Sequence, residues 1–375
     1  KEKPDVGTFM REWLSLYDSK SGERGIYNSM SAKRTTDKLN QKKDKDGNNI
    51  IRRHAREDFG TNPCSEIILR SREFCNLTEC VIRGWDDSKS LKKKVRLATI
   101  LGTWQSTLTN FKYLTGEWKR NCDEERLLGV SLTGIMDNGI TNGGAGGLGE
   151  RLTELRNETV KTNQIWAEKL GIPNSAAITC VKPSGTVSQL VDSASGIHAR
   201  HNPYYIRTVR GDNKDPITKF MKAEGFPSEP DVTKPNHTTV FSFPMASPEG
   251  AVCRKDMTAL EQLELWKVYA QNWCEHKPSV TISVKEDEWV DTAAWVYENF
   301  DEISGISFLP FSDHTYKQAP YQDCSKEEYE EMANKMPKNV DWSKLSEYEQ
   351  KDFTVASQEL ACSAGQCEVV DLPAA

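Results

Sequence analysis

Long apolar runs are missing from this chain. Its 375 residues are 37% hydrophobic and 28% charged, and no stretch approaches the roughly 20 consecutive apolar residues of a membrane-spanning helix. Residues 1–6 carry no apolar core of the kind found in a secretory signal. We therefore expect a globular cytoplasmic protein with a sizeable core, built as one large α/β domain or as a few smaller ones.

An excess of basic charge is missing as well. The net charge of −6 provides no general positive field for a nucleic-acid backbone. The densest basic run, residues 33–56, is interleaved with Asp37, Asp44 and Asp46, and we interpret it as a solvated loop. We expect no direct contact with nucleic acid or with a membrane.

The spacing typical of zinc sites is absent although cysteine itself is plentiful. No CxxC pair occurs among ten cysteines, and disulfide scaffolds are a feature of short secreted chains. We expect no structural metal site and reduced thiols, some with redox or catalytic roles. The cysteines are Cys64, Cys75, Cys80, Cys122, Cys180, Cys253, Cys274, Cys324, Cys362 and Cys367.

The apolar pattern predicts alternating helices and strands. Apolar residues recur at three- and four-residue steps in residues 88–111 and 256–275, which predicts amphipathic helices. Short runs rich in β-branched or aromatic residues predict strands at 177–181, 238–243, 279–284 and 305–309. This alternation predicts a mostly parallel α/β sheet or barrel.

Composition also suggests how the chain is divided. We expect a catalytic part over residues 1–321, a charged and partly helical extension over 322–355, and a mobile tail over 356–375. The first residue is lysine rather than methionine, so we expect a fragment, a processed product or one half of a split protein.

The densest cluster of reactive residue types is Asn62-Pro63-Cys64-Ser65-Glu66. Proline disfavours helix at the preceding residue, so a loop is expected, and in an extended segment Asn62, Cys64 and Glu66 would share one face. An amide, a thiol and a carboxylate together suit a nucleotide sugar, because they can orient hydroxyls, carry a radical or electrons, and accept a proton. On these residues alone, a buried structural cysteine beside a surface glutamate is an equal alternative.

Two further motifs have both a functional and an ordinary interpretation. Lys182-Pro183-Ser184-Gly185-Thr186-Val187-Ser188 follows a predicted strand and could offer N–H groups and hydroxyls to a phosphate, or be a plain turn. It is not a Walker A loop, because no Gly-Lys-Ser/Thr follows. Cys362 and Cys367 stand five residues apart and could form a local disulfide on a mobile tail, or be incidental.

Residues 62–77, which include Arg-Ser-Arg-Glu-Phe-Cys-Asn-Leu at 70–77, resemble the finger loop of adenosylcobalamin-dependent (class II) ribonucleotide reductases. The eleven-residue separation of Cys64 and Cys75 matches the monomeric ribonucleoside-triphosphate reductase branch of that family. The segment 183–207 and the tail cysteines follow in family order. The resemblance covers essentially the whole chain and is to the C-terminal catalytic half of the family.

The resemblance implies a fold and a set of roles. The fold would be the second half of a ten-stranded α/β barrel, with a finger loop at about 60–77 that carries the radical cysteine, a phosphate loop at 183–188 and a flexible C-terminal tail. The implied roles are a thiyl radical on Cys64, a base at the 3′ hydroxyl in Glu66, hydrogen bonding to the substrate by Asn62, one of two reducing thiols in Cys75, phosphate binding by Ser184, Gly185, Thr186, Val187 and Ser188, and electron relay by Cys362 and Cys367.

The same resemblance implies partners that the chain does not supply. Adenosylcobalamin would be the cofactor, a ribonucleotide the substrate, and thioredoxin or a similar dithiol the reductant. The second reducing cysteine and the effector site would lie in the N-terminal half of the reductase, since no cysteine precedes Cys64.

Other functions are weighed against this one. A ribonucleoside-diphosphate reductase of a dimeric class is the nearest alternative, and a non-catalytic nucleotide-binding subunit is a remote one. A thiol–disulfide oxidoreductase would need a CxxC motif, which the chain lacks. His198, Tyr204 and Tyr205 are expected to pack under the phosphate loop, and His314 is expected to be structural or at the edge of the cofactor site rather than a cobalt ligand.

Overall fold

The computed structural model describes residues 3–22, 24–40, 47, 51–53, 58–311 and 317–349. They fall into two compact units, one formed by residues 1–200 and 249–311 and the other by residues 201–248 and 312–375, so far as these are described. Within the described part, no helix is both long and apolar enough to cross a membrane. The division into three parts expected from composition stays a prediction.

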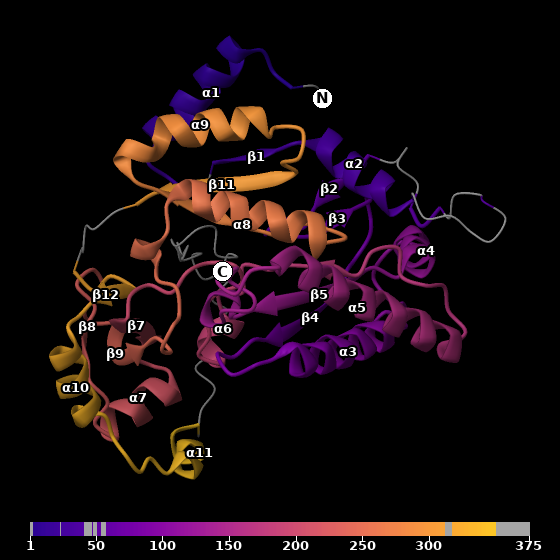
Figure 1. Cartoon of the computed structure of the whole chain (residues 1–375). Helices are drawn as coiled ribbons and strands as arrows, with labels where there is room; N and C mark the ends of the chain where they lie inside the picture. Colours follow the sequence, from indigo (N-terminus) through magenta and orange to yellow (C-terminus); the bar gives the residue numbers. More distant parts are fainter. Residues whose placement is uncertain are drawn as a thin grey trace, which may run out of the picture. The chain divides into compact units, whose positions relative to one another are not determined.

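The first unit is built on parallel strands (Figure 1). One group pairs in parallel in the order β4-β5-β6, and a second pairs β10 with β11, whose free side pairs antiparallel with β1. A separate two-stranded hairpin, β2-β3, lies outside both groups. The bounds are β1 Gly25–Tyr27, β2 Gly60–Thr61, β3 Ile68–Leu69, β4 Asn76–Val81, β5 Leu128–Thr133, β6 Thr179–Cys180, β10 Thr281–Val284 and β11 Gly305–Pro310.

An isolated parallel bridge between Val181 and Pro278 joins the two groups. Hydrogen bonds from Val181 N to Lys277 O (3.3 Å) and from Ser279 N to Val181 O (2.8 Å) continue the pairing on either side. The parallel strands therefore follow one another in the row β4-β5-β6-β10-β11. No closed barrel forms among the described residues, so the structure supports a mixed α/β fold with an open row of parallel strands.

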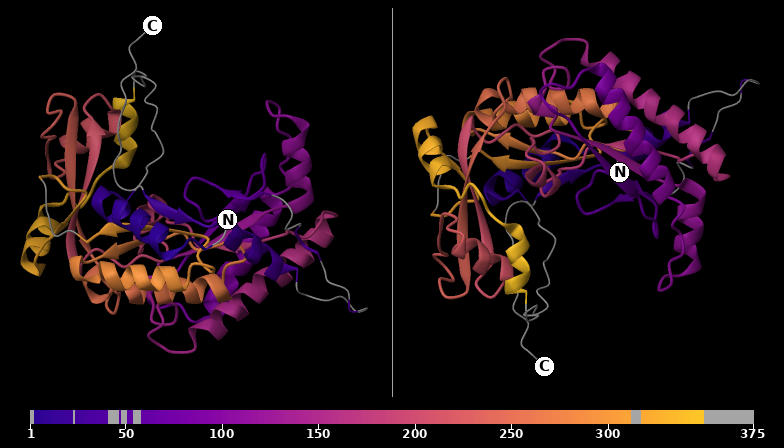
Figure 2. Two further views of the ribbon diagram at one scale, coloured as in Figure 1. Left: turned by 90° about the horizontal axis from the view of Figure 1, so that it is seen from above. Right: turned by 90° about the horizontal axis from the view of Figure 1, so that it is seen from below.

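Helices cover one side of this row. Figure 2 shows α3, α5 and α8 on the same side of the strands, and α3 packs on β4 and β5 while α8 packs on β10. The helices of the unit are α1 Val6–Ser19, α2 Ser29–Leu39, α3 Ser88–Gln105, α4 Gly116–Glu125, α5 Leu148–Leu170, α6 Val187–Leu190, α8 Ala259–Asn272 and α9 Trp289–Glu298.

Two buried tryptophans, Trp266 of α8 and Trp273 at the C-cap of the same helix, hold the junction of the strand groups. The indole nitrogen of Trp266 donates to Pro278 O (3.0 Å), and that of Trp273 donates to Cys180 O (2.8 Å). Both side chains are at most 1% exposed and belong to the main hydrophobic core. Buried indole groups need such acceptors, so the apolar face of α8 fixes the junction as well as covering it.

The predicted helices and strands of this unit are confirmed; most are shorter than predicted, and β11 extends one residue further, to Pro310. The helix expected over 88–111 ends at Gln105, because the hydroxyls of Ser106 and Thr107 bond back to carbonyl oxygens of Thr103 and Trp104 and compete with helix continuation. The helix expected over 256–275 begins at Ala259, where Thr258 forms a capping box with Glu261.

The second unit has an antiparallel sheet that the sequence pattern did not predict. Its strand order is β12-β7-β9-β8, and all three pairings are antiparallel. The expectation of a mostly parallel arrangement is therefore wrong here, because β7 and β9 pair antiparallel over nine residues, and α7, which lies between them in the chain, does not serve as a parallel crossover. The bounds are β7 Tyr204–Asp212, β8 Ser228–Pro230, β9 Thr238–Ala246, β12 Tyr321–Asp323, α7 Pro216–Ala223, α10 Lys326–Lys335 and α11 Leu345–Tyr348.

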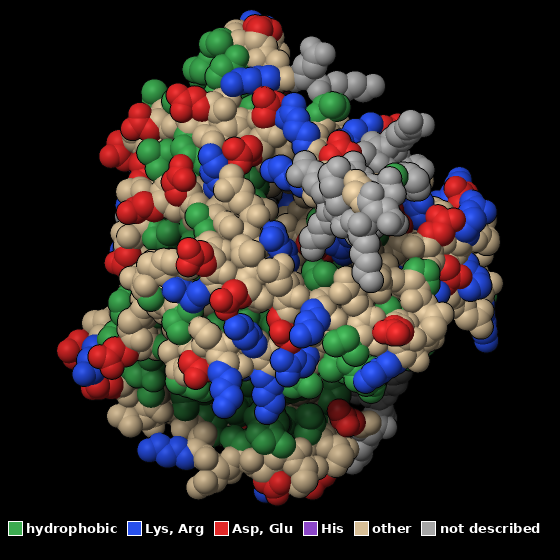
Figure 3. Space-filling view, turned by 45° about the vertical axis from the view of Figure 1, so that its right-hand side comes forward, with side chains coloured by type: hydrophobic (Ala, Val, Ile, Leu, Met, Phe, Trp, Pro, Cys, Tyr) green, Lys and Arg blue, Asp and Glu red, His purple; other side chains and the backbone are tan. Residues whose placement is uncertain are grey.

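Charged side chains of both signs are interspersed on the face drawn in Figure 3. This mixture accords with the small negative net charge of the chain. On that face no broad field of one sign is visible that would attract a polyanion.

Candidate active site

The predicted finger loop forms a tight turn at the tip of the β2-β3 hairpin. Asn62 O accepts a hydrogen bond from Ser65 N (2.9 Å), and Asn62 Oδ1 accepts one from Ile67 N (3.0 Å). Ser65 has a φ of 67°, in the left-handed region. The loop is thus not the extended segment that residue spacing suggested. The side-chain oxygen of Asn62 is already used to close the turn. Of the polar atoms of this side chain, the amide nitrogen is the one without a partner within the described residues.

The turn exposes Cys64 and buries Glu66. Cys64 is exposed, whereas Glu66 is only 1% exposed, and its Oε2 has no hydrogen-bond partner in the described part of the chain. A buried carboxylate oxygen without a partner is costly, so such an atom marks a place where a ligand or water can bind.

The two candidate thiols are even weaker acids than an ordinary cysteine. Cys64 is exposed, but the protein around it removes part of the hydration of its sulfur, which raises the pKa of the Cys64 thiol, and the negative charge of Glu66 adds to the rise. Burial also raises the pKa of the Cys75 thiol well above its usual value, and Glu66 again adds to the effect. Both cysteines are therefore thiols at neutral pH, which suits hydrogen-atom donation better than nucleophilic attack.

Cys75 shares a face of β4 with a carboxylate that the motifs did not reveal. Side chains alternate along a strand, so Cys75, Leu77 and Glu79 point away from α3. A Cβ added at Gly129 would lie 3.2 Å from Cys75 Sγ and 2.4 Å from Leu77, so only glycine fits beside this thiol. The spacing of two between strand residues could have identified Glu79.

Glu79 lies at the phosphate loop. Burial raises the pKa of Glu79, while the hydroxyl of Ser184 and the charge of Lys182 act in the opposite direction, and Glu66 reinforces the rise. Both its carboxylate oxygens are buried without a geometric hydrogen bond within the described residues. The two carboxylates thus lie within electrostatic reach of each other.

The predicted phosphate loop starts directly after the strand junction. Ser184 has a φ of 56° and is 5% exposed, and its hydroxyl lies near the Glu79 carboxylate without forming a well-aligned hydrogen bond in the described structure. The backbone N–H groups of Gly185, Thr186 and Val187 have no acceptor among the described residues either, at the first turn of α6. Free N–H groups at the start of a helical turn can bind an anion.

Ser188 differs from the rest of the loop. It is fully buried, and its hydroxyl bonds to that of Ser195 (2.7 Å). His198 ties the segment that follows to β10: its Nδ1 donates to Ser195 O (2.9 Å), and its Nε2 accepts from Thr281 N (3.0 Å). The packing role expected for His198 is thus confirmed, and Ser188 supports the loop from inside.

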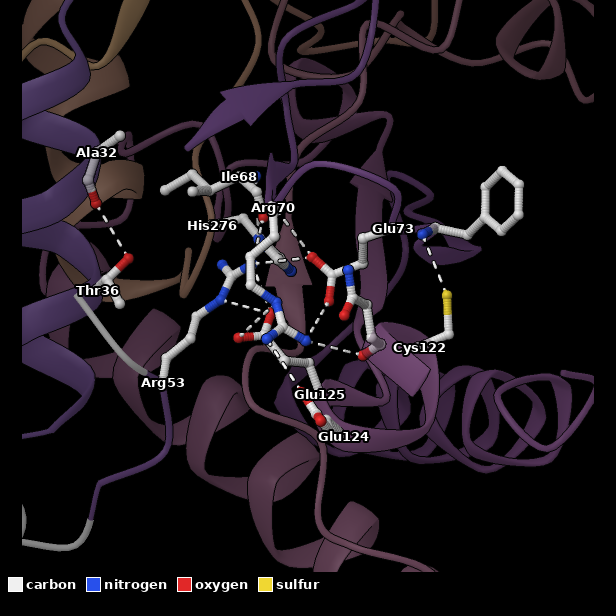
Figure 4. Close-up of polar contacts among 12 residues, drawn as sticks. Ala32, Thr36, Arg53, Ile68, Arg70, Glu73, Cys122, Glu124, Glu125 and His276 are labelled. Carbon is white, nitrogen blue, oxygen red and sulfur yellow. Dashed lines mark hydrogen bonds and ion pairs between the residues drawn. The ribbon is translucent and has the colours of Figure 1, made fainter. Parts of the chain in front are cut away.

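A buried ionic cluster anchors the base of the finger loop (Figure 4). Arg53, whose side chain is 1% exposed, donates to Glu125 Oε2 (2.8 Å) and to Ile68 O (2.8 Å), and its Nη2 lies 3.4 Å from Glu73 Oε2. Arg70 N donates to the same oxygen of Glu73 (3.0 Å). Burial raises the pKa of Glu73 to about 8, and the charge of Glu125 adds to the rise.

Some of the predicted site residues lie outside the described residues. Cys362 and Cys367 are among these, and so is His314. In the ranges that are described, no group of three or more His, Cys, Asp or Glu residues is arranged to hold a metal ion.

Comparison with solved structures defines the class of fold. A B12-dependent (class II) ribonucleotide reductase matches with a TM-score of 0.74 at 24% identity, over 92% of this chain and 50% of that chain. The class Id ribonucleotide reductase alpha subunit of Actinobacillus ureae matches with a TM-score of 0.54 at 13% identity, over 81% and 61%. The chain therefore has a ribonucleotide reductase fold.

Sequence relatives narrow this class. Adenosylcobalamin-dependent ribonucleoside-triphosphate reductases of Lactobacillus gasseri and Euglena gracilis are 27% and 29% identical, over 83% and 82% of this chain. A probable enzyme of the same name from Dictyostelium discoideum is 28% identical over 84% of the chain. No protein-family model matches. The resemblance seen in the motifs is confirmed: the chain is homologous to these reductases over most of its length.

The chain spans less than half the length of these relatives. The aligned region is 45% of the Lactobacillus gasseri protein and 42% of the Euglena gracilis protein.

The ionic cluster predicts a specific pH dependence of stability. The pKa of Glu73 is raised from 4.5 to about 8, so the folded state binds more protons than the unfolded state between these values, and stability is lost as pH rises through about 8. Gln at position 73 mimics the protonated acid. We expect Glu73→Gln to lack the loss of stability that deprotonation of Glu73 causes in the wild type. The free energy of unfolding of the variant, minus that of the wild type, should therefore be larger at pH 9 than at pH 5.

Urea denaturation at several pH values measures this difference. Glu117→Gln is the control, since Glu117 is an exposed partner of Arg72 outside the buried cluster. A constant difference between Glu73→Gln and wild type from pH 5 to pH 9 would contradict the proposed protonation of Glu73.

Proposed function

We propose that the chain is the catalytic part of a class II ribonucleotide reductase, which converts ribonucleotides to 2′-deoxyribonucleotides. The names of its relatives favour triphosphates as substrates. The observation that carries the proposal is the buried, unpartnered Oε2 of Glu66, whose carboxylate acts electrostatically on two protonated thiols, those of Cys64 and Cys75. The open row of five parallel strands, β4-β5-β6-β10-β11, would be half of a ten-stranded barrel.

The exposure and protonation of Cys64 fit a radical-generating cofactor. Its thiol is accessible and carries a hydrogen atom at neutral pH, as a donor to an external radical must. Adenosylcobalamin, when bound, supplies a carbon-centred radical that can remove this hydrogen atom. With that hydrogen atom removed, the sulfur of Cys64 would carry the thiyl radical.

The remaining steps use the side chains of the loop. The Cys64 thiyl radical takes the hydrogen atom from the 3′ carbon, and Glu66 accepts the 3′-hydroxyl proton. The 2′ carbon–oxygen bond then breaks, and the hydroxyl leaves as water after gaining a proton. Cys75 and a second thiol together supply two electrons and two protons, one proton to the leaving hydroxyl and one hydrogen to the 2′ carbon, and become a disulfide. Cys64 finally returns its hydrogen atom to the 3′ carbon, and Glu66 returns the proton to the 3′ oxygen.

Substrate binding is assigned to the second loop and to Asn62. The unpaired N–H groups of Gly185, Thr186 and Val187 and the hydroxyl of Ser184 would hold the phosphates. The free amide nitrogen of Asn62 would donate to a ribose hydroxyl. Ser188 would act indirectly, through the packing of the loop.

Partners complete the proposal. A further part of the reductase, on a companion chain or on the same one, would carry the second reducing cysteine and the effector site. Thioredoxin or a similar dithiol would regenerate Cys75 through Cys362 and Cys367. A non-catalytic nucleotide-binding subunit would have no use for the buried carboxylate of Glu66 beside these thiols.

Substitutions in the finger loop test the proposal. Cys64→Ser should abolish deoxynucleotide formation, because an O–H bond is too strong to be opened in place of S–H. Glu66→Gln should lower kcat by roughly 100- to 10,000-fold, the usual contribution of a general base. Product is measured in the reductase assembled with adenosylcobalamin and a dithiol.

The matched control is Cys324→Ser, a partly exposed cysteine of the second unit, which should leave the rate unchanged. Turnover by Cys64→Ser at the rate of the control would overturn the assignment of the radical site.

The tail cysteines have a separable role. If Cys362 and Cys367 only relay electrons, the double serine variant should complete about one turnover from the pre-reduced state and then stall with thioredoxin as reductant. A small dithiol that reaches the site directly should restore multiple turnover. Rapid-quench product counting distinguishes these cases, and unchanged thioredoxin-driven turnover would exclude the tail from the mechanism.

A further inference from the structure

A short segment before β10 contacts the finger loop at four of its residues. The segment is residues 276–279, and it comes from a part of the chain more than 200 positions away. The hydrogen bonds, in order along the loop, are Ser279 Oγ to Cys64 O (2.6 Å), Lys277 Nζ to Ser65 Oγ (2.6 Å), Lys277 N to Glu66 O (3.2 Å) and Ile68 N to His276 Nδ1 (3.3 Å).

His276 is neutral in this arrangement. Burial lowers its pKa to about 3, and the charge of Arg53 adds to the effect. Its Nε2 therefore donates to Leu128 O (2.9 Å), which leaves Nδ1 to accept from the loop. The hydrogen bond from Ile68 N to His276 therefore holds the backbone of the loop with a neutral side chain.

Lys277 is the unusual member of the segment. It is 1% exposed, and its ammonium makes one hydrogen bond within the described residues, to the hydroxyl of Ser65. A Cβ at Gly305 would lie 2.0 Å from Lys277 Nζ, so the fold reserves space for this group. Burying an ammonium costs several kcal/mol unless it is well paired, and an apolar side chain of similar volume would be at least as stable here.

The charge of Lys277 also faces Glu66. Burial lowers the pKa of Lys277 to about 7, and the negative charge of Glu66 opposes this change. Glu66 Oε2 nevertheless stays without a hydrogen-bond partner in the described structure. In its protonated form, Lys277 can thus offset the charge of the carboxylate without occupying the oxygen that the reaction needs.

We propose that Lys277 is the positioning residue of the finger loop. Through the hydroxyl of Ser65 it holds the turn in its left-handed conformation, and so sets the direction of Cys64 on one side and Glu66 on the other. The effect on turnover rests on the proposed function, whereas the effect on the loop does not.

Two substitutions remove the contact from opposite ends. Lys277→Met keeps the volume and removes the ammonium, and Ser65→Ala removes only the acceptor on a partly exposed residue. Lys267→Met is the control, because the ammonium of Lys267 bonds to Asn299 Oδ1 (2.7 Å) and pairs with Glu302 Oε1 (3.6 Å), both away from the loop. The double variant of Lys277 and Ser65 completes a mutant cycle.

Hydrogen exchange of the full chain is the first readout. We expect Lys277→Met and Ser65→Ala each to speed exchange in peptides covering residues 60–69 by on the order of tenfold, the value of one hydrogen bond to a charged group. The double variant should be no worse than either single one. The melting temperature of Lys277→Met should stay the same or rise. Unchanged exchange in the loop, or exchange that rises equally throughout the chain with a lower melting temperature, would overturn the proposal.

Turnover of the assembled reductase is the second readout. Misplacement of the loop should lower kcat by on the order of 100-fold with little change in the KM for nucleotide, since the phosphate loop is untouched. A normal kcat for Lys277→Met in an active wild-type background would also overturn the proposal. If the unsubstituted assembly makes no deoxynucleotide, the proposed function fails, and the exchange experiment still decides the role of Lys277.

Discussion

The parallel bridge between Val181 and Pro278 is the contact on which the candidate site depends. It is the only pairing between the two groups of parallel strands in the described part of the chain. On one side of it the chain runs directly into the phosphate loop, and on the other side residues 276–279 reach the finger loop. Because Trp266 and Trp273 bond to the carbonyl groups next to the bridge, the core of the unit fixes both loops from the same place.

Electrostatics within this arrangement favours radical chemistry over ionic chemistry at sulfur. Burial and the charge of Glu66 keep Cys64 and Cys75 protonated. Thiolates would react as nucleophiles, whereas thiols give up hydrogen atoms and accept oxidation as a pair. Two lysines lie near the site: the charge of Lys182 acts on Cys64, and that of Lys277 acts on Glu66. Neither makes a hydrogen bond to Oε2 of Glu66 in the described structure.

Motifs and periodicity predicted the parallel core and selected the candidate reactive residues, whose roles stay predictions, but they did not predict how these residues are held. The helix of Trp266 and Trp273 and the strand at 279–284 follow from apolar spacing alone. The turn at Asn62 does not, since a hydrogen bond from Ile67 decides it over the extended form. Lys277 carries no sequence signal, because its burial depends on Gly305, which is distant along the chain. The antiparallel sheet was missed because strand pairing is a long-range choice that local pattern does not specify.

The central claim is that this chain directs a cobalamin-initiated radical to the 3′ carbon of a ribonucleotide. The most direct measurement is deoxynucleotide formation from a ribonucleoside triphosphate by this chain combined with the remaining part of the reductase, with and without adenosylcobalamin, using substrate carrying hydrogen or deuterium at the 3′ carbon. The account predicts product only when both protein parts and adenosylcobalamin are present, and slower formation from the 3′-deuterated substrate. Product in the absence of adenosylcobalamin would contradict it.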